Sequence, residues 1–362
     1  MLKKLDIYII KKYLGTFLFT ILMITMIAIA IDFFEKVDKF LKDDVTVHQI
    51  VFDYYLNFIP WINGLLWPLF ALLAVIFFTS RLAGDSEIIS MLSAGISYQR
   101  IMRPYLIASI ILASIHWTAK NYLIPHSNKI KGEFESEYIR KSNKKTLKDN
   151  THFFLNKNEK VYIKYFRRSD STANTFRLEK FKQGNLSYVL KARKLEYLSP
   201  PNNWKLVDFE WLKIDSLKEE LYLSHGESYD TTFNFTPQDV FRYFNQMEMM
   251  NTTDLRNFIA VEQSRGIDTA TKYKTELYSR TSDPFTIIIL TLLGLAIASR
   301  KTRGGMGLHL AMAVMLGSAF VILSKFSMTF SANLGMHPLL GAWIPNIIFG
   351  IITIYLVRTA QK

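Results

Sequence analysis

The sequence of 362 residues lacks several features that would indicate a particular chemistry. It contains no cysteine, which excludes disulfide bonds and thiolate-ligated metal sites. It contains no G-x-x-x-x-G-K-[ST] loop, so the chain cannot hydrolyse a nucleoside triphosphate by the P-loop route. Its seven histidines are dispersed, and none belongs to an H-E-x-x-H motif. We therefore expect neither a metal site nor a cofactor.

What the sequence does contain is long apolar stretches. Six occur, three on each side of a polar segment: 13–34, 56–79, 103–123, 284–299, 306–330 and 338–357. Each is close to the ~20 apolar residues that a helix needs to cross a ~30 Å hydrocarbon layer. Helices in the core of a soluble protein seldom run so far without a charge. We predict an α-helical membrane protein with six transmembrane helices in a 3+3 order.

Lysine and arginine gather on one side of these stretches. Twelve lie near the two chain ends or in the loops after the second and fourth stretches: Lys3, Lys4, Lys11, Lys12, Arg81, Arg100, Arg103, Arg300, Lys301, Arg303, Arg358 and Lys362. The opposite short loops hold only Lys36, Lys39 and Lys42. By the positive-inside rule, both termini and the loops 80–102 and 300–305 are cytoplasmic. The polar segment then lies in the periplasm of a double-membrane bacterium, and the helices span its inner (cytoplasmic) membrane.

The net charge of +13 raises the question of a nucleic-acid partner. The cytoplasmic flanks account for much of this excess, whereas the polar segment mixes both signs. Its densest basic cluster is Lys144, Lys145 and Lys148. A solvated surface, or contact with anionic lipid headgroups, explains such a cluster more simply. We expect no nucleic-acid partner.

Short alternating runs in the polar segment predict β-strands. The runs are 161–166, 176–181, 186–197, 204–214 and 229–235. Val161, Ile163 and Tyr165 illustrate the alternation, which places one face of each strand inside. Turn residues separate the runs at 184–185, at 199–203 and at Gly226. We predict an antiparallel sandwich or jelly roll, an all-β periplasmic domain inserted between helices 3 and 4.

These patterns divide the chain into four parts. Residues 1–123 hold the first three helices, 124–250 the stalk and jelly-roll-like domain, 251–283 connector helices, and 284–362 the last three helices. In the connector, Thr252-Thr253-Asp254 is predicted to cap a helix, and Gly266 to stop it.

The cytoplasmic loop between helices 2 and 3 contains one predicted short helix, at about 85–95. Asp85 or Ser86 supplies its N-cap, Glu87 lies in the first turn, and Gly95 suits a left-handed stop. The residues predicted to form an apolar ridge along one side are Ile88, Met91, Leu92 and Gly95. Such a ridge can fill a groove on a soluble partner. The alternative is a surface helix that rests on lipid.

The segment 85–97, Asp-Ser-Glu-Ile-Ile-Ser-Met-Leu-Ser-Ala-Gly-Ile-Ser, resembles the coupling-helix signature of the LptF/LptG permeases. These are the transmembrane subunits of the lipopolysaccharide exporter. The likeness extends over nearly the whole chain. It includes Lys36-Val37-Asp38 after the first stretch, the segment from 254–258 through 264–266 to Pro284, and the closing helix 338–358.

The resemblance implies a transport subunit rather than an enzyme. It implies a second LptF/LptG-type permease, a cytoplasmic LptB-type ATPase dimer, and periplasmic LptC/LptA-type jelly-roll proteins as partners, with lipopolysaccharide as the cargo. ATP-driven closure would move the lipid from the outer leaflet of the inner membrane into the periplasmic bridge. The residues expected to bind the ATPase are Asp85, Ser86, Glu87, Ile88, Met91, Leu92 and Gly95.

The same resemblance points to lipid contacts. Family members hold lipid phosphates with basic residues near the periplasmic end of the first helix, where Lys36 and Lys39 lie here. A family lysine aligns with Glu35, so an interfacial anchor is an equal interpretation of Lys36. Lys325 falls near the gate that spans one and five form in the family, with snorkelling as its alternative. The residues expected at the substrate gate are Phe33, Phe34, Lys36, Lys39, Phe320 and Lys325.

Two other functions compete with this interpretation. An integral-membrane enzyme acting on a lipid-linked substrate would need a cluster of carboxylates or histidines at one membrane level, and the sequence shows none. A force-transmitting ABC permease that moves no lipid, as in the FtsX/MacB group, has four spans with the large domain after the first. The 3+3 order argues against it.

Overall fold

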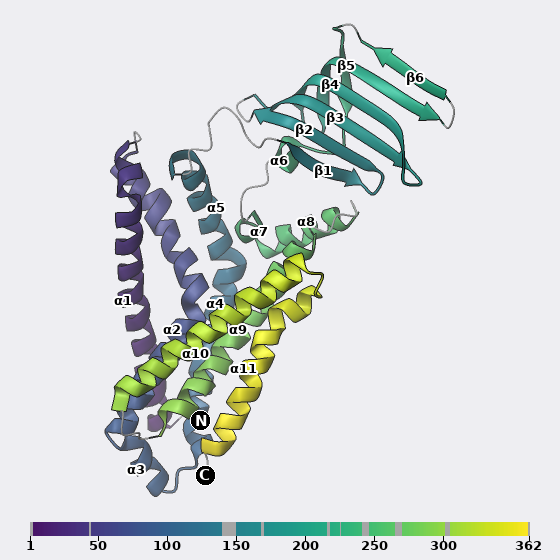
Figure 1. Cartoon of the computed structure of the whole chain (residues 1–362). Coiled ribbons are helices and arrows are strands. Elements are labelled where there is room, and N and C mark those ends of the chain that lie inside the picture. The colour runs from purple at the N-terminus through teal and green to yellow at the C-terminus, as the bar shows by residue number, and fades with distance from the viewer. Residues whose placement is uncertain are drawn as a thin grey trace. The chain divides into compact units, whose positions relative to one another are not determined.

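The computed structural model describes residues 3–42, 45–139, 150–167, 170–215, 218–224, 226–240, 246–264, 270–300 and 305–360 (Figure 1). The chain forms two compact units. The helical unit comprises Met1–Phe134, Met247–Leu255 and Thr271–Lys362. The strand unit comprises Glu135–Gln246 and Arg256–Ala270.

Within the described ranges, six helices are long and apolar enough to cross a membrane, which confirms the 3+3 prediction. The three before the strand region are α1 (Lys4–Lys42), α2 (Leu56–Gly84) and α4 (Tyr98–Thr118). The three after it are α9 (Ala270–Ala298), α10 (Gly305–Asn333) and α11 (Pro338–Ala360). The π-helix η1 (Gln49–Tyr55) precedes α2, and α4 continues through η2 (Ala119–Leu123), α5 (Ile124–Phe134) and η3 (Glu135–Ile139).

The helices extend beyond the apolar stretches. The 39 residues of α1 rise about 58 Å, nearly twice the ~30 Å of the hydrocarbon layer. Pro284, where the fourth stretch begins, lies inside α9 rather than at its start. Residues 270–283 of the predicted connector are therefore the first part of that same helix. Hydropathy marks only the apolar part of a helix, so polar turns at its ends escape notice.

The centre of the helical unit is the contact between α2 and α9. In the most apolar 18-residue stretch of each span, 50% of the residues are buried in α2 and 61% in α9, against 17% in α1 and 22% in α10. Gly294 of α9 lies at this contact. A Cβ there would lie 2.5 Å from Cγ1 of Val75 and 3.0 Å from Cγ1 of Ile76. The missing side chain is thus what allows this close packing.

The strand unit contains one antiparallel sheet, which confirms the predicted all-β insertion between helices 3 and 4. Its strands are β1 (Thr151–Asn156), β2 (Glu159–Arg167), β3 (Thr172–Lys182), β4 (Asn185–Ser199), β5 (Asn203–Asp215), β6 (Lys218–Leu223) and β7 (Ser228–Thr232). The described strands run in the order β1-β2-β3-β4-β5-β6, and β7 also pairs with β5 (Figure 1). Each strand thus pairs with its neighbour in the sequence, apart from β7.

One face of this sheet carries the core of the strand unit. Val161, Ile163 and Phe176 are fully buried, as the alternation of apolar residues predicts. Trp204 is also fully buried, and its indole Nε1 donates a hydrogen bond to the carbonyl oxygen of Phe235 over 3.0 Å. That bond satisfies the one polar atom of the largest side chain in this core.

Two short helices, α6 (Pro237–Val240) and α7 (Gln246–Met249), precede α8 (Thr252–Ser264). Asn251 caps α8, because its side-chain oxygen accepts a hydrogen bond from the backbone N–H of Asp254 over 2.8 Å. The predicted stop at Gly266 and the basic cluster 144–148 lie outside the described residues.

Candidate functional site

The short helix predicted in the loop between spans two and three is α3 (Glu87–Ser93). Gly95 follows it with a φ of 84°, which confirms the left-handed stop. The N–H of Gly95 donates to the carbonyl of Leu92 over 3.0 Å, and that of Ile96 to Met91 over 3.1 Å. These two bonds close the helix in the Schellman pattern. At its other end Ser86 is the N-cap residue, with a φ of 60° and no capping bond from its side chain.

The apolar residues of α3 divide between two faces. Ile88 is only 2% exposed and belongs to the core of the helical unit, and Met91 packs partly buried against that core. Ile89 and Leu92 are 48% and 43% exposed. The predicted ridge is therefore corrected, because Ile88 and Met91 fasten α3 to the bundle. The apolar surface that remains accessible centres on Ile89 and Leu92.

Two polar contacts join the loop around α3 to the first turns of α1. The hydroxyl of Tyr8 donates a hydrogen bond to Oε2 of Glu87 over 3.4 Å. Arg100, in the first turn of α4, donates two hydrogen bonds to the carboxylate of Asp6, each 2.6 Å long. Asp6 is only 2% exposed. The loop that carries α3 is therefore tied to α1 as well as to α2 and α4.

The far end of α1 holds a second polar cluster. The ammonium of Lys36 contacts the carboxylate of Asp32 and the hydroxyl of Tyr54. Tyr54 in turn donates to Asp32 over 3.0 Å, and Tyr55 approaches the same carboxylate at 3.4 Å. The side chain of Lys36 is only 15% exposed. Its charge is thus balanced inside the helical unit by a carboxylate one turn earlier.

The other residues expected at the lipid gate lie in different environments. Lys39 is exposed one turn beyond Lys36, and Phe34 is 76% exposed and Phe33 40%. Phe320 is only 8% exposed and packs edge-on against Phe349 of α11, with ring centroids 5.1 Å apart. Lys325 is exposed on α10. The structure therefore leaves Lys39, Phe33 and Phe34 exposed on the last turns of α1, and places Phe320 in the core.

Sequence reasoning did not predict that a group of charged side chains converges between η2, α7 and α9. Lys120 and Asp283 form an ion pair of 2.9 Å. Arg280, with 2% of its side chain exposed, pairs with Glu276 over 3.2 Å and donates to the carbonyl of Met247 over 3.0 Å. Lys120, a charge within the predicted span 103–123, is the signal that could have identified this group.

Glu248 of α7 faces the same group. Asn128 donates to its backbone carbonyl over 3.0 Å, which holds α7 against α5. Burial, and then the charge of Glu276, raise the pKa of the Glu248 carboxyl above its ordinary value. Lys120, Lys131 and Lys325 act in the opposite direction. Among the described residues, no three His, Asp or Glu side chains converge as metal ligands would.

Comparison with known proteins adds a family to this geometry. Residues 7–359 match the family model described as lipopolysaccharide export system permease LptF/LptG. The chain is 19% identical over 359 residues to the lipopolysaccharide export system permease protein LptG of Escherichia coli strain K12, covering 96% of this chain and 98% of that protein. It is 20% identical over 356 residues to the protein of the same name from Haemophilus influenzae, covering 96% of each.

Proposed function

This chain belongs to the lipopolysaccharide export system permease LptF/LptG family, and from that premise we propose that it is the LptG-type subunit of the exporter. In this role it pairs with a second LptF/LptG-type permease. The two extract lipopolysaccharide from the inner membrane and pass it to LptC/LptA-type proteins in the periplasm. The family match supports this role because it covers all six spans and the inserted sheet.

The energy for transport comes, in this proposal, from an LptB-type ATPase dimer in the cytoplasm. The chain has no P-loop of its own. The observation that carries the proposal is that one face of α3 is packed against the bundle and the other is exposed. The helix is fastened through Ile88 and Met91, while Ile89 and Leu92 remain exposed for a partner groove. Closure of the ATPase dimer would push α3, and the Tyr8–Glu87 and Asp6–Arg100 contacts would pass that motion to α1.

The lipid contacts of the proposal lie at the other end of α1. We assign the first phosphate contact to Lys39, because it is exposed on the last turns of α1, where Phe33 and Phe34 are exposed as well. Lys36 then orders the helix end through Asp32 and Tyr54, and Lys325 on α10 contributes from the opposite gate helix. Exposed cations beside exposed aromatic rings suit the phosphates and acyl chains of lipopolysaccharide.

The proposal requires α3 in the cytoplasm and the sheet in the periplasm. The absence of native cysteine allows a direct test with single-cysteine variants. In spheroplasts, a membrane-impermeant maleimide should label Ser228→Cys on exposed β7, and should label Ser93→Cys only after permeabilisation. The reverse pattern would overturn the orientation.

The central experiment is reconstitution. The chain, expressed with its neighbouring permease and purified in mild detergent, should carry an ATPase with it. In nanodiscs, lipopolysaccharide should stimulate ATP hydrolysis and be released to the periplasmic bridge protein in an ATP-dependent manner. Hydrolysis that ignores lipopolysaccharide, or a preparation without any ATPase, would contradict the proposal.

A further inference from the structure

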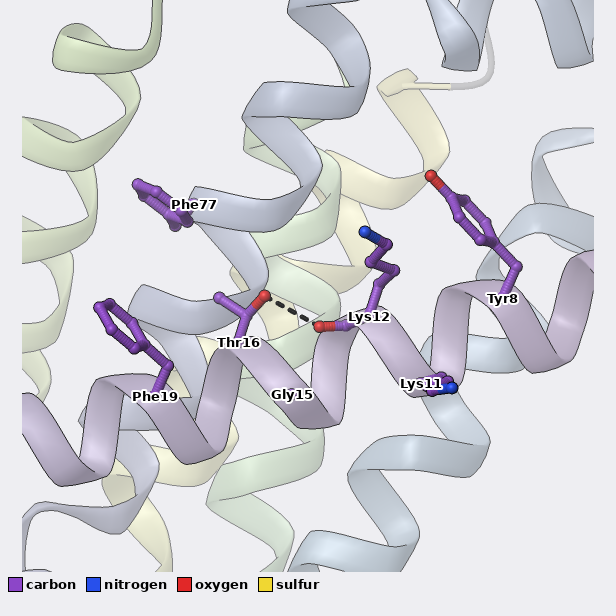
Figure 2. A pocket seen from close by; sticks show the side chains of 7 residues that line it. All are labelled: Tyr8, Lys11, Lys12, Gly15, Thr16, Phe19 and Phe77. Atoms are coloured by element: carbon purple, nitrogen blue, oxygen red, sulfur yellow. Dashed lines mark hydrogen bonds between the residues drawn. The ribbon is translucent and has the colours of Figure 1, made fainter.

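A groove runs along the first turns of α1, at the end opposite Lys36. Its lining consists of Tyr8, Lys11, Lys12, Gly15, Thr16 and Phe19 of α1, and Phe77 of α2 (Figure 2). The groove is open to the surroundings and has a volume of about 600 Å³. It is too polar at one end to be a simple gap between apolar helices.

The lining changes in character along the groove. Figure 2 shows Tyr8 and Lys12 close together at one end, and Phe19 and Phe77 at the other. The ammonium of Lys12 lies 6.0 Å from the centroid of the Tyr8 ring. Gly15 lies between the two ends, and a Cβ there would meet no atom within 4 Å. A cationic end and an apolar end are therefore joined by an unobstructed middle.

The positive charge of this groove is not balanced within the described part of the chain. Lys11 and Lys12 are both exposed, and neither forms an ion pair with any carboxylate described there. Thr16 adds no charge, and its hydroxyl donates to the carbonyl of Lys12 over 2.9 Å. The binding groups that this end offers are thus two ammonium groups, because the Tyr8 hydroxyl already donates to Glu87.

The groove is far from the proposed lipopolysaccharide contacts. From Lys12 to Lys36 the helix rises about 36 Å, more than the ~30 Å hydrocarbon layer. If α1 crosses the membrane as the proposed function requires, the two lysines lie at opposite leaflets. Lysine clusters between transmembrane helices on the cytoplasmic side bind anionic lipid headgroups.

We propose that this groove binds an anionic phospholipid of the cytoplasmic leaflet. Its phosphate lies between the Lys11 and Lys12 ammonium groups, and an acyl chain passes Gly15 to lie against Phe19 and Phe77. The inference goes beyond the cargo and rests on the proposed function only for the direction of α1.

The bound lipid would also lie beside the contact that joins α1 to α3. Tyr8 lines the groove and donates to Glu87, the first residue of α3. A phosphate beside Tyr8 fixes the position of its ring, and through it the start of α3. The phospholipid is therefore a structural ligand of the junction between α1 and the helix that meets the ATPase.

Native mass spectrometry of the intact permease complex tests the binding. Complexes are released from nanodiscs that contain phosphatidylglycerol and phosphatidylcholine in equal amounts, and the retained lipids are counted. Removing each lysine should lower phosphatidylglycerol retention roughly fivefold. K11Q/K12Q should therefore lose the preference for phosphatidylglycerol. The control K3Q/K4Q removes the same charge at the same end of α1 but outside the groove. It should keep the preference for phosphatidylglycerol.

Two further experiments test whether the ligand is a lipid and whether it lies along Gly15. G15L adds bulk to the open middle without changing charge, and should lower phosphatidylglycerol retention as well. Inorganic phosphate at 10 mM, which is about ten-thousandfold above a Kd of ~1 μM, should not displace the lipid. Displacement by phosphate would show an anion site without lipid specificity, and would overturn the proposal.

Two other results would also overturn the proposal. Equal retention by K11Q/K12Q and K3Q/K4Q would overturn the proposal, as would a photo-crosslinker at Phe19 that captures the second permease instead of phospholipid. Because the readout is lipid binding, failure here with intact lipopolysaccharide-stimulated hydrolysis refutes this inference alone. Loss of stimulated hydrolysis in otherwise unmodified complexes refutes the proposed function alone.

Discussion

Asp6 and Arg100 form a two-pronged ion pair in which each guanidinium NH group lies 2.6 Å from a different carboxylate oxygen. The pair joins the first turn of α1 to the first turn of α4. It therefore ties to α1 the α4 end of the loop that carries α3. Two parallel charge-assisted bonds fix an orientation as well as a distance.

Replacing Asp6 by asparagine should weaken this junction. Asp6→Asn removes the charge but keeps the shape, and leaves the Arg100 guanidinium without its partner. We expect a lower melting temperature in detergent and weaker stimulation of ATP hydrolysis by lipopolysaccharide. Arg81→Gln is the control, because the Arg81–Asp85 pair is 4.0 Å apart with side chains 75% and 62% exposed. Equal melting temperatures for Asp6→Asn and Arg81→Gln would show that the Asp6–Arg100 pair does not stabilise the junction between α1 and α4.

The two faces of α3 should respond differently to substitution. Leu92→Arg changes the exposed face, so we expect unchanged melting but loss of the copurifying ATPase. Ile88→Ala removes a buried side chain and should cost roughly 2–5 kcal/mol of stability. Retention of the ATPase by Leu92→Arg would mean that α3 does not dock through this face.

Lys36 and Lys39 should separate into a structural and a binding residue. Lys39→Glu should reduce photo-crosslinking of lipopolysaccharide to α1 without changing the melting temperature, because Lys39 is exposed. Lys36→Gln should instead lower the melting temperature, because it leaves Asp32 without its cation. Unchanged crosslinking in Lys39→Glu, and likewise in Lys325→Glu, would make both lysines simple interfacial anchors.

Glu248 should make stability depend on pH. Its pKa is raised by burial and by Glu276, so the folded protein binds more protons than the unfolded one in the affected range. Stability then falls as the pH rises above about 4.3, the ordinary value for glutamate, and levels off above the folded pKa. Glu248→Gln should be more stable at neutral pH and flatten this slope. Glu219→Gln on exposed β6 should leave the slope unchanged, and an identical slope in Glu248→Gln would contradict the assignment.

The sequence predicts the parts of this structure that obey a local rule. The six apolar stretches, the left-handed Gly95 and the alternating strands such as β2 follow from hydropathy, backbone sterics and the period of the pleat. The strands β1 and β6 lay outside the predicted runs. Every residue of β6 is exposed, so no burial imposes an alternation there.

The parts that the sequence did not predict depend on tertiary contact. A helical period shows that Ile88 and Leu92 are close on α3, but not which of them meets the bundle. The pairing of Lys36 with Asp32 makes an apparent phosphate ligand into an internal ion pair. Similarly, Arg280 joins α9 to α7 through contacts between segments far apart in the chain.

The glycine contact between α2 and α9 has a consequence for movement during transport. With Gly294 against Val75 and Ile76, the inner helices cannot separate without opening a cavity in tightly packed atoms. The outer helices α1 and α10 bury far less of their apolar surface. A Cβ on Gly317 of α10 would likewise lie 2.3 Å from Cδ1 of Leu69 in α2, so the same constraint applies to α10. Of these four helices, α1 is therefore the one whose displacement breaks the least packing.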